Sequence, residues 1–198
     1  MAKLYFYYSA MNAGKSTVLL QSAHNYKERG MDTILFTPAL DQRFAKGKIH
    51  SRIGLSADAV PFDSAFNLFE HTRQIKTQQD KLECVFVDEA QFLNKAQVRQ
   101  LVDIVDQLNL PVLAYGLRSD YMGESFEGSQ YLLIWADNLV EIKTICQCGK
   151  KAIMNLRIDA EGRPVQTGAQ VHIGGNQQYV AMCRKHYFKA KQSIEQIA

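Results

Sequence analysis

Short apolar runs alternate with longer stretches of mixed polarity up to about residue 144. The apolar runs are nearly continuous, which is typical of parallel strands buried on both faces. They predict five strands, at residues 4–8, 33–37, 84–88, 111–115 and 139–143. The mixed stretches predict helices at residues 15–28, 63–79, 94–108 and 126–135. We therefore expect an α/β fold in which helices cover both faces of a parallel sheet.

The pattern changes after residue 144, where cysteines, glycines and turn-forming residues become frequent. Turn signals occur at residues 159–164 and again at Gly174-Gly175-Asn176. These features predict a small, loop-rich second unit. We expect a nucleotide-binding α/β domain at residues 1–144, a small domain at residues 145–190, and a polar tail or fraying helix at residues 191–198.

Composition narrows the class of protein. The 198 residues are 46% hydrophobic and 22% charged, which are values of globular domains. The net charge of +3 is too small to argue for nucleic acid or a membrane surface as a partner. No run of apolar residues is long enough to cross a bilayer, and the N-terminus does not resemble a secretory signal. We expect a cytoplasmic protein whose four cysteines stay reduced.

The first predicted strand runs into Ser9-Ala-Met-Asn-Ala-Gly-Lys-Ser16, the tail of a phosphate-binding loop. Backbone N–H groups of such a loop wrap a triphosphate, and the following helix directs its positive end at the same oxygens. Lys15 can reach the β- and γ-phosphates, and the Ser16 hydroxyl can coordinate magnesium. Ser9 replaces the usual first glycine, while Asn12 tolerates left-handed backbone. The alternative is a fortuitous Gly-Lys-Ser helix start.

The strand predicted at residues 84–88 ends in two acids, Asp88 and Glu89. In phosphate-loop folds, the acid at such a strand end approaches magnesium. Because ligands gather at the carboxyl ends of parallel strands, Asp88 should meet the loop at residues 9–16. Glu89 is then placed to take a proton from an attacking hydroxyl. Alternatively, both acids favour the start of the next helix.

Three cysteines and one histidine have the spacing of a tetrahedral zinc site, namely Cys146-x-Cys148 followed by Cys183-x-x-His186. The site would be closed and structural, because no further ligand is evident. The alternative is three buried thiols and a surface histidine. Cys84 lies within a predicted strand and is expected in the core.

Together, these motifs resemble the cytosolic, zinc-containing thymidine kinases, from about residue 3 to 188. The resemblance is marked for the enterobacterial members, which share the start Leu-Tyr-Phe-Tyr-Tyr-Ser-Ala-Met-Asn-Ala-Gly-Lys-Ser. It implies a RecA-like sheet joined to a small zinc-ribbon domain with a lasso loop. The implied reaction moves the γ-phosphate of ATP to the 5′-hydroxyl of thymidine. A homotetramer and feedback by dTTP are also implied.

The resemblance assigns residues to three sites. The implied ATP and magnesium residues are Ser9, Ala10, Met11, Asn12, Ala13, Gly14, Lys15, Ser16, Asp41, Arg43, Asp88, Glu89, Ala90 and Gln91. The implied nucleoside residues are Met11, Phe92, Leu117, Tyr121, Phe126, Gln170, Val171, His172, Ile173, Gly174 and Tyr179. The implied zinc ligands are Cys146, Cys148, Cys183 and His186. Tyr121 stands where the family often has phenylalanine.

In this interpretation Glu89 is the catalytic base, and Arg43 near the phosphates helps offset developing charge. Without the resemblance, Asp41 and Arg43 are more typical of a surface ion pair. The aromatic residues would equally suit ordinary packing. Two other functions stay open. One is a RecA-like ATPase acting on nucleic acid, although the chain lacks a basic, aromatic-interleaved stripe. The other is a zinc-ribbon binding module with a degenerate nucleotide site.

Overall fold

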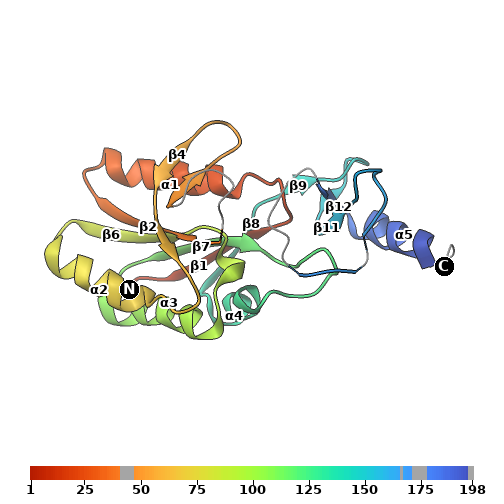
Figure 1. Cartoon of the computed structure of the whole chain (residues 1–198). Helices are drawn as coiled ribbons and strands as arrows, with labels where there is room; N and C mark the ends of the chain where they lie inside the picture. Colours follow the sequence, from red (N-terminus) through yellow and green to blue (C-terminus); the bar gives the residue numbers. More distant parts are fainter. Residues whose placement is uncertain (41–46, 166, 171–177, 196–198) are drawn as a thin grey trace.

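A six-stranded parallel sheet forms the centre of the larger part of the chain (Figure 1). The computed structural model describes residues 1–40, 47–165, 167–170 and 178–195. The strand order is β5-β2-β6-β7-β1-β8, and every pairing is parallel. The strands are β1 (Leu4–Ser9), β2 (Asp32–Pro38), β5 (Val60–Phe62), β6 (Leu82–Val87), β7 (Val112–Leu117) and β8 (Asn138–Glu141). The predicted α/β fold class is confirmed.

Helices cover both faces of this sheet (Figure 1). Helix α1 (Lys15–Glu28) packs on one face. Helices α2 (Leu68–Gln78), α3 (Lys95–Leu108) and α4 (Glu127–Trp135) lie on the other. In β6, Cys84 and Phe86 face α1, whereas Val85 and Val87 face the helices opposite. All four of these side chains are fully buried, which explains the nearly continuous apolar runs in the sequence.

Four predicted helices and five predicted strands occur where expected, with differences at their ends. The helix predicted at 63–79 begins at Leu68, because the Asn67 side chain accepts a hydrogen bond from the Glu70 amide and caps it. Asp63 ends up in a turn before that cap. Gly30 follows α1 with a φ of 73°, as expected of a residue just beyond a helix. Between residues 1 and 144, three short strands were not predicted: β3 (Lys48–His50), β4 (Ser56–Asp58) and the edge strand β5.

The described part of the small unit is built from two pairs of antiparallel strands and a helix. Strands β9 (Thr144–Ile145) and β10 (Lys151–Ala152) form one pair, and β11 (Met154–Arg157) and β12 (Tyr179–Met182) form the other. Helix α5 (Arg184–Glu195) follows β12. This unit lies beyond the carboxyl ends of the large sheet, on the side of the phosphate-binding loop (Figure 1). No helix among the described residues has the length and apolar character needed to span a bilayer.

Candidate active site and metal centre

The loop between β1 and α1 has the backbone that its sequence predicts. Asn12 and Gly14 both adopt the left-handed conformation, with φ values of 63° and 83°. The Val18 amide donates to the Gly14 carbonyl at 3.0 Å, which begins the helix. The N-terminus of a helix presents backbone N–H groups to whatever lies before it. A loop of this shape, followed by a helix N-terminus, suits an anion.

The loop wraps around its own lysine. The Lys15 ammonium donates to the Ser9 hydroxyl at 3.1 Å and to the Ala10 carbonyl at 3.2 Å. Ser9, Ala10 and Lys15 are all buried. The Lys15 ammonium is therefore held inside the loop and is not exposed to solvent. Ser9 contributes a hydroxyl contact to it, at the position where other phosphate loops carry glycine.

Asp88, directly after β6, meets the first turn of α1. The Ser16 hydroxyl lies 3.1 Å and 3.3 Å from the two carboxylate oxygens of Asp88. Burial, followed by the neighbouring Glu89 charge, raises the pKa of Asp88 to about 7. A hydroxyl beside a carboxylate is a pair of hard oxygen ligands, which is the donor set that magnesium prefers.

Glu89 is held in a defined orientation. Its backbone is left-handed, with a φ of 48°, at the start of the short 3₁₀ helix η1 (Ala90–Phe92). The Gln91 side-chain nitrogen donates to the Glu89 carboxylate at 2.6 Å. The Gln91 side-chain oxygen accepts from the Leu117 backbone amide at 3.0 Å. Gly116 permits this contact, because a Cβ there would lie 3.0 Å from Gln91. Gln91 therefore fastens the Glu89 carboxylate to β7.

One cavity of about 290 Å³ joins these elements. It is lined by Met11, Asn12, Ala13, Gly14, Lys15, Ser16, Thr17, Thr37, Lys48, Ile49, His50, Ser51, Arg52, Ile53, Asp88, Glu89 and Leu117. Lys15 and Glu89 thus face the same space. Four predicted ATP-site residues are buried and do not line this cavity, namely Ser9, Ala10, Ala90 and Gln91.

Two contributions to this region were not predicted. Residues 48–53, including the hairpin strand β3, form one wall of the cavity. Lys48 and His50 lie on the same face of β3, and residues 51–53 follow that strand. A strand of three residues is too short to give a clear signal in the sequence. The second is Asn155 of β11. Its side-chain oxygen accepts from the Met11 amide at 2.7 Å, and its nitrogen donates to the Ser119 carbonyl at 2.9 Å.

Four of the predicted nucleoside residues form two aromatic pairs. Phe92 and Phe126 meet edge to face at 6.0 Å between ring centroids, as do Tyr121 and Tyr179 at 6.5 Å. Gln170 contacts the connection between β7 and α4. Among the described residues, these five are not part of the cavity lining given above, whereas Met11 and Leu117 are. Asp41, Arg43, Val171, His172, Ile173 and Gly174 lie outside the described residues.

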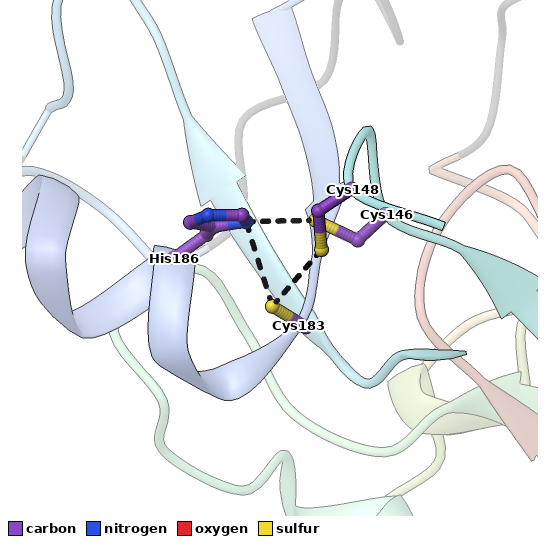
Figure 2. A group of neighbouring side chains, drawn as sticks. All are labelled: Cys146, Cys148, Cys183 and His186. Atoms are coloured by element: carbon purple, nitrogen blue, oxygen red, sulfur yellow. Dashed lines mark hydrogen bonds between the residues drawn. The ribbon is translucent and has the colours of Figure 1, made fainter. Parts of the chain in front are cut away.

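The three cysteines and the histidine converge in the small unit (Figure 2). Cys146 and Cys148 follow β9, Cys183 follows β12, and His186 lies in the first turn of α5. Their ligand atoms lie within 4.8 Å of one another. The sulfur atoms of Cys148 and Cys183 are 3.8 Å apart. His186 Nδ1 lies 3.3 Å from the Cys146 sulfur and 3.6 Å from the Cys183 sulfur.

These separations match a tetrahedral metal site. Zinc–sulfur bonds of about 2.3 Å put two sulfur ligands about 3.8 Å apart in tetrahedral geometry. Hydrogen bonds from the Cys148 and Cys183 amides, together with His186, lower the pKa of Cys146 to about 6, which favours the thiolate that binds metal. The four residues can therefore hold a metal ion. Cys84 lies apart from them, fully buried in the core facing α1, as predicted.

Comparison with known proteins agrees with this geometry. The family model described as thymidine kinase matches residues 2–187. A thymidine kinase of Legionella pneumophila is 61% identical over 98% of this chain and 93% of its own length. The thymidine kinase of Escherichia coli K12 is 59% identical over 97% and 93%, and that of Coxiella burnetii is 59% identical over 94% and 95%. The chain belongs to the thymidine kinase family.

Proposed function

We propose that this protein transfers the γ-phosphoryl group of ATP to the 5′-hydroxyl of thymidine, giving dTMP and ADP. The relatives named above, which match nearly the whole chain, are thymidine kinases. The observation that carries the proposal is the shared cavity: a phosphate-binding lysine, Lys15, and a carboxylate suited to act as a base, Glu89, line one space.

The donor triphosphate is held by the loop and by α1. The amides of residues 12–16 and the Lys15 ammonium offer positive charge to the β- and γ-phosphates. Ser16 and Asp88 would hold magnesium, and their oxygen donor set and mutual distance of 3.1 Å fit that ion. When bound, magnesium neutralises charge on the phosphate oxygens. Ala10, Asn12 and Gly14 contribute main-chain shape rather than side-chain chemistry.

Glu89 is the proposed general base. As the 5′-oxygen of thymidine bonds to the γ-phosphorus, the bond from that phosphorus to the β,γ-bridging oxygen breaks and ADP departs. The Glu89 carboxylate takes the proton that the 5′-hydroxyl loses. The hydrogen bond from Gln91 supports this role, because it holds the carboxylate in one orientation. Asp41 and Arg43 stay predictions, as additional groups at the phosphates.

The thymidine side is proposed to begin at Met11 and Leu117, which line the cavity. Phe92, Phe126, Tyr121 and Tyr179 are proposed to form its aromatic surroundings, supported by their edge-to-face pairing. Gln170 and the residues from Val171 to Gly174 are proposed to cover the base. Thymine offers two carbonyl acceptors around one N–H donor, which main-chain groups of a loop can complement.

The metal centre is proposed to hold structural zinc. A complete set of four ligands, three thiolates and one imidazole, supports this, because catalytic zinc keeps an open position. The cluster ties β9, β12 and α5 together in a unit whose two hydrophobic clusters contain few buried residues. The proposed division near residue 145 is supported by the separation of those clusters from the two large ones. Helix α5 continues past residue 190 to Glu195. A cytoplasmic location, a homotetramer and dTTP feedback stay predictions.

An assay with γ-labelled ATP across a panel of nucleosides tests the proposed function. We expect labelled monophosphate from thymidine, dependent on magnesium. Hydrolysis of ATP stimulated by single-stranded DNA, with no labelled nucleotide formed, would instead support an ATPase acting on nucleic acid. Absence of both activities in folded, zinc-loaded protein would leave only the binding-module alternative.

A further inference from the structure

Helix α5 donates two hydrogen bonds to the connection between β7 and α4, residues 118–126. The Tyr187 hydroxyl donates to the Tyr121 carbonyl at 2.9 Å, and the Lys191 ammonium donates to the Met122 carbonyl at 2.9 Å. Tyr187 is only 1% exposed. Gly123 allows the close approach: its φ is 92°, and a Cβ there would lie 3.2 Å from the Tyr187 oxygen. The backbone of this connection is therefore fixed to the small unit.

From its other side, the same connection holds the described residues 167–170. The Tyr121 hydroxyl donates to the Gly168 carbonyl at 3.1 Å. Gln170 donates through its side-chain nitrogen to the Asp120 carboxylate at 2.9 Å. The second Asp120 oxygen accepts from the Met122 and Glu124 amides, both at 2.9 Å, so the carboxylate has a fixed direction. Asp120 is 2% exposed and Tyr121 is 1% exposed.

Packing restricts the position of Gly168 further. The Arg157 guanidinium lies over the Tyr121 ring, 5.5 Å from its centroid. A Cβ on Gly168 would sit 3.5 Å from both the Arg157 terminal nitrogen and the Tyr121 oxygen, and the φ of Gly168 is 130°. That conformation is accessible mainly to glycine. The Gly168 carbonyl therefore lies where the Tyr121 hydroxyl can reach it, on a segment whose backbone conformation is one that glycine adopts readily.

We propose that Asp120 and Tyr121 are positioning residues, which fix residues 167–170 beside the thymidine side of the active site. This inference rests on the proposed function for its kinetic consequence. The connection begins next to Leu117, which lines the cavity, and ends at Phe126, which packs on Phe92 beside Glu89 and Gln91. Residues 167–170 are thereby tied to the same connection that borders the reacting groups. The Tyr121 hydroxyl therefore has a role separate from that of its aromatic ring: it holds the Gly168 carbonyl.

Tyr121→Phe isolates this task, because it removes the hydroxyl and keeps the ring. The Asp120–Gln170 hydrogen bond stays, so the variant is expected to fold. Loss of one hydrogen bond between neutral groups corresponds to about a two- to tenfold change in an equilibrium. We expect KM for thymidine to rise by about that factor, more than kcat falls, with KM for ATP the least affected. Tyr131→Phe, on α4, is the control, and wild-type values are expected for it.

A second readout is independent of activity. Gly168-Ala169 is the only Gly-Ala pair in the sequence. Protein labelled with carbonyl-¹³C glycine and ¹⁵N alanine therefore gives a single carbonyl–amide cross-peak in a triple-resonance NMR spectrum. We expect Tyr121→Phe to move its ¹³C resonance upfield, because the carbonyl loses a donor, and Tyr131→Phe to leave it in place. Gln170→Leu breaks the other contact and should move the same peak, which covers the case of a Tyr121 variant that folds poorly.

The outcomes separate the two proposals. If the cross-peak moves in neither Tyr121→Phe nor Gln170→Leu, the proposal that Asp120 and Tyr121 fix residues 167–170 is overturned, whatever the activity. A peak that moves while thymidine KM stays at the wild-type value overturns its role in positioning. If the wild-type protein does not phosphorylate thymidine, the proposed function fails, and the NMR result still decides whether the hydroxyl holds Gly168.

Discussion

Gly128, at the start of α4, is the position where a single methyl group should perturb the active site most informatively. A Cβ there would lie 2.5 Å from the Ala90 carbonyl oxygen and 2.7 Å from that of Leu93, closer than such atoms approach in proteins. Both oxygens belong to the backbone around η1, so neither can rotate away. Gly128 is helical, and on propensity alone alanine would stabilise the helix by about 0.5–1 kcal/mol.

Overpacking of this kind costs about 1–3 kcal/mol, so the clash should reverse the sign. We expect Gly128→Ala to lower the free energy of unfolding by about 1–2 kcal/mol, and the melting temperature by roughly 2–8 °C for a chain of this size. Turnover should fall too, because η1 carries the Gln91 that orients Glu89. Thermal unfolding at equal protein concentration measures the effect, with Gln130→Ala on the exposed face of α4 as control. A Gly128→Ala protein as stable as wild type would refute this packing argument.

Two further predictions concern the metal centre and acid stability. Purified protein should contain about one zinc ion per chain, and either a strong chelator or Cys148→Ser should remove it and lower the melting temperature, as metal analysis and calorimetry would record. Unchanged stability after complete removal of the metal would contradict a structural role. Burial lowers the pKa of His71, so the unfolded chain binds more protons than the folded one below about pH 6.5. The contribution of His71 to stability should therefore be complete above that pH and decrease as pH falls. Urea unfolding across this range should show a smaller decrease in the free energy of unfolding for His71→Leu than for wild type. An equal dependence of that free energy on pH in both proteins would exclude His71 as its source.

The sheet and its helices were predictable because short apolar runs alternate clearly with longer stretches of mixed polarity in the sequence. Runs such as Cys84–Val87 are apolar at every position, since neighbouring side chains enter cores on opposite faces. The short elements carry too little signal. Strand β5 contains Pro61, which is compatible with an edge strand but argues against a strand in the sequence alone. Strands β3 and β4 are each three residues long and follow a segment outside the described residues.

The meeting of the phosphate loop with Asp88 could be predicted because parallel strands collect ligands at their carboxyl ends. The same rule put Glu89 at that edge, but could not show that Gln91 orients it. Asn155 was missed for a different reason. Its hydrogen bond to Met11 spans 144 residues and joins two units, and no local pattern encodes such a contact.

The central claim is that Glu89 takes the proton from an acceptor bound beside the phosphates held by Lys15. Glu89→Gln tests it most directly, because the amide can still accept the hydrogen bond from Gln91 but cannot act as a base. Glu83→Gln, at an exposed position on β6, the strand that precedes Glu89, is the matched control. With thymidine and MgATP both bound, we predict that kcat of Glu89→Gln falls by about 10²–10⁴-fold while Glu83→Gln keeps the wild-type value. A Glu89→Gln enzyme that turns over at nearly the wild-type rate would contradict the account.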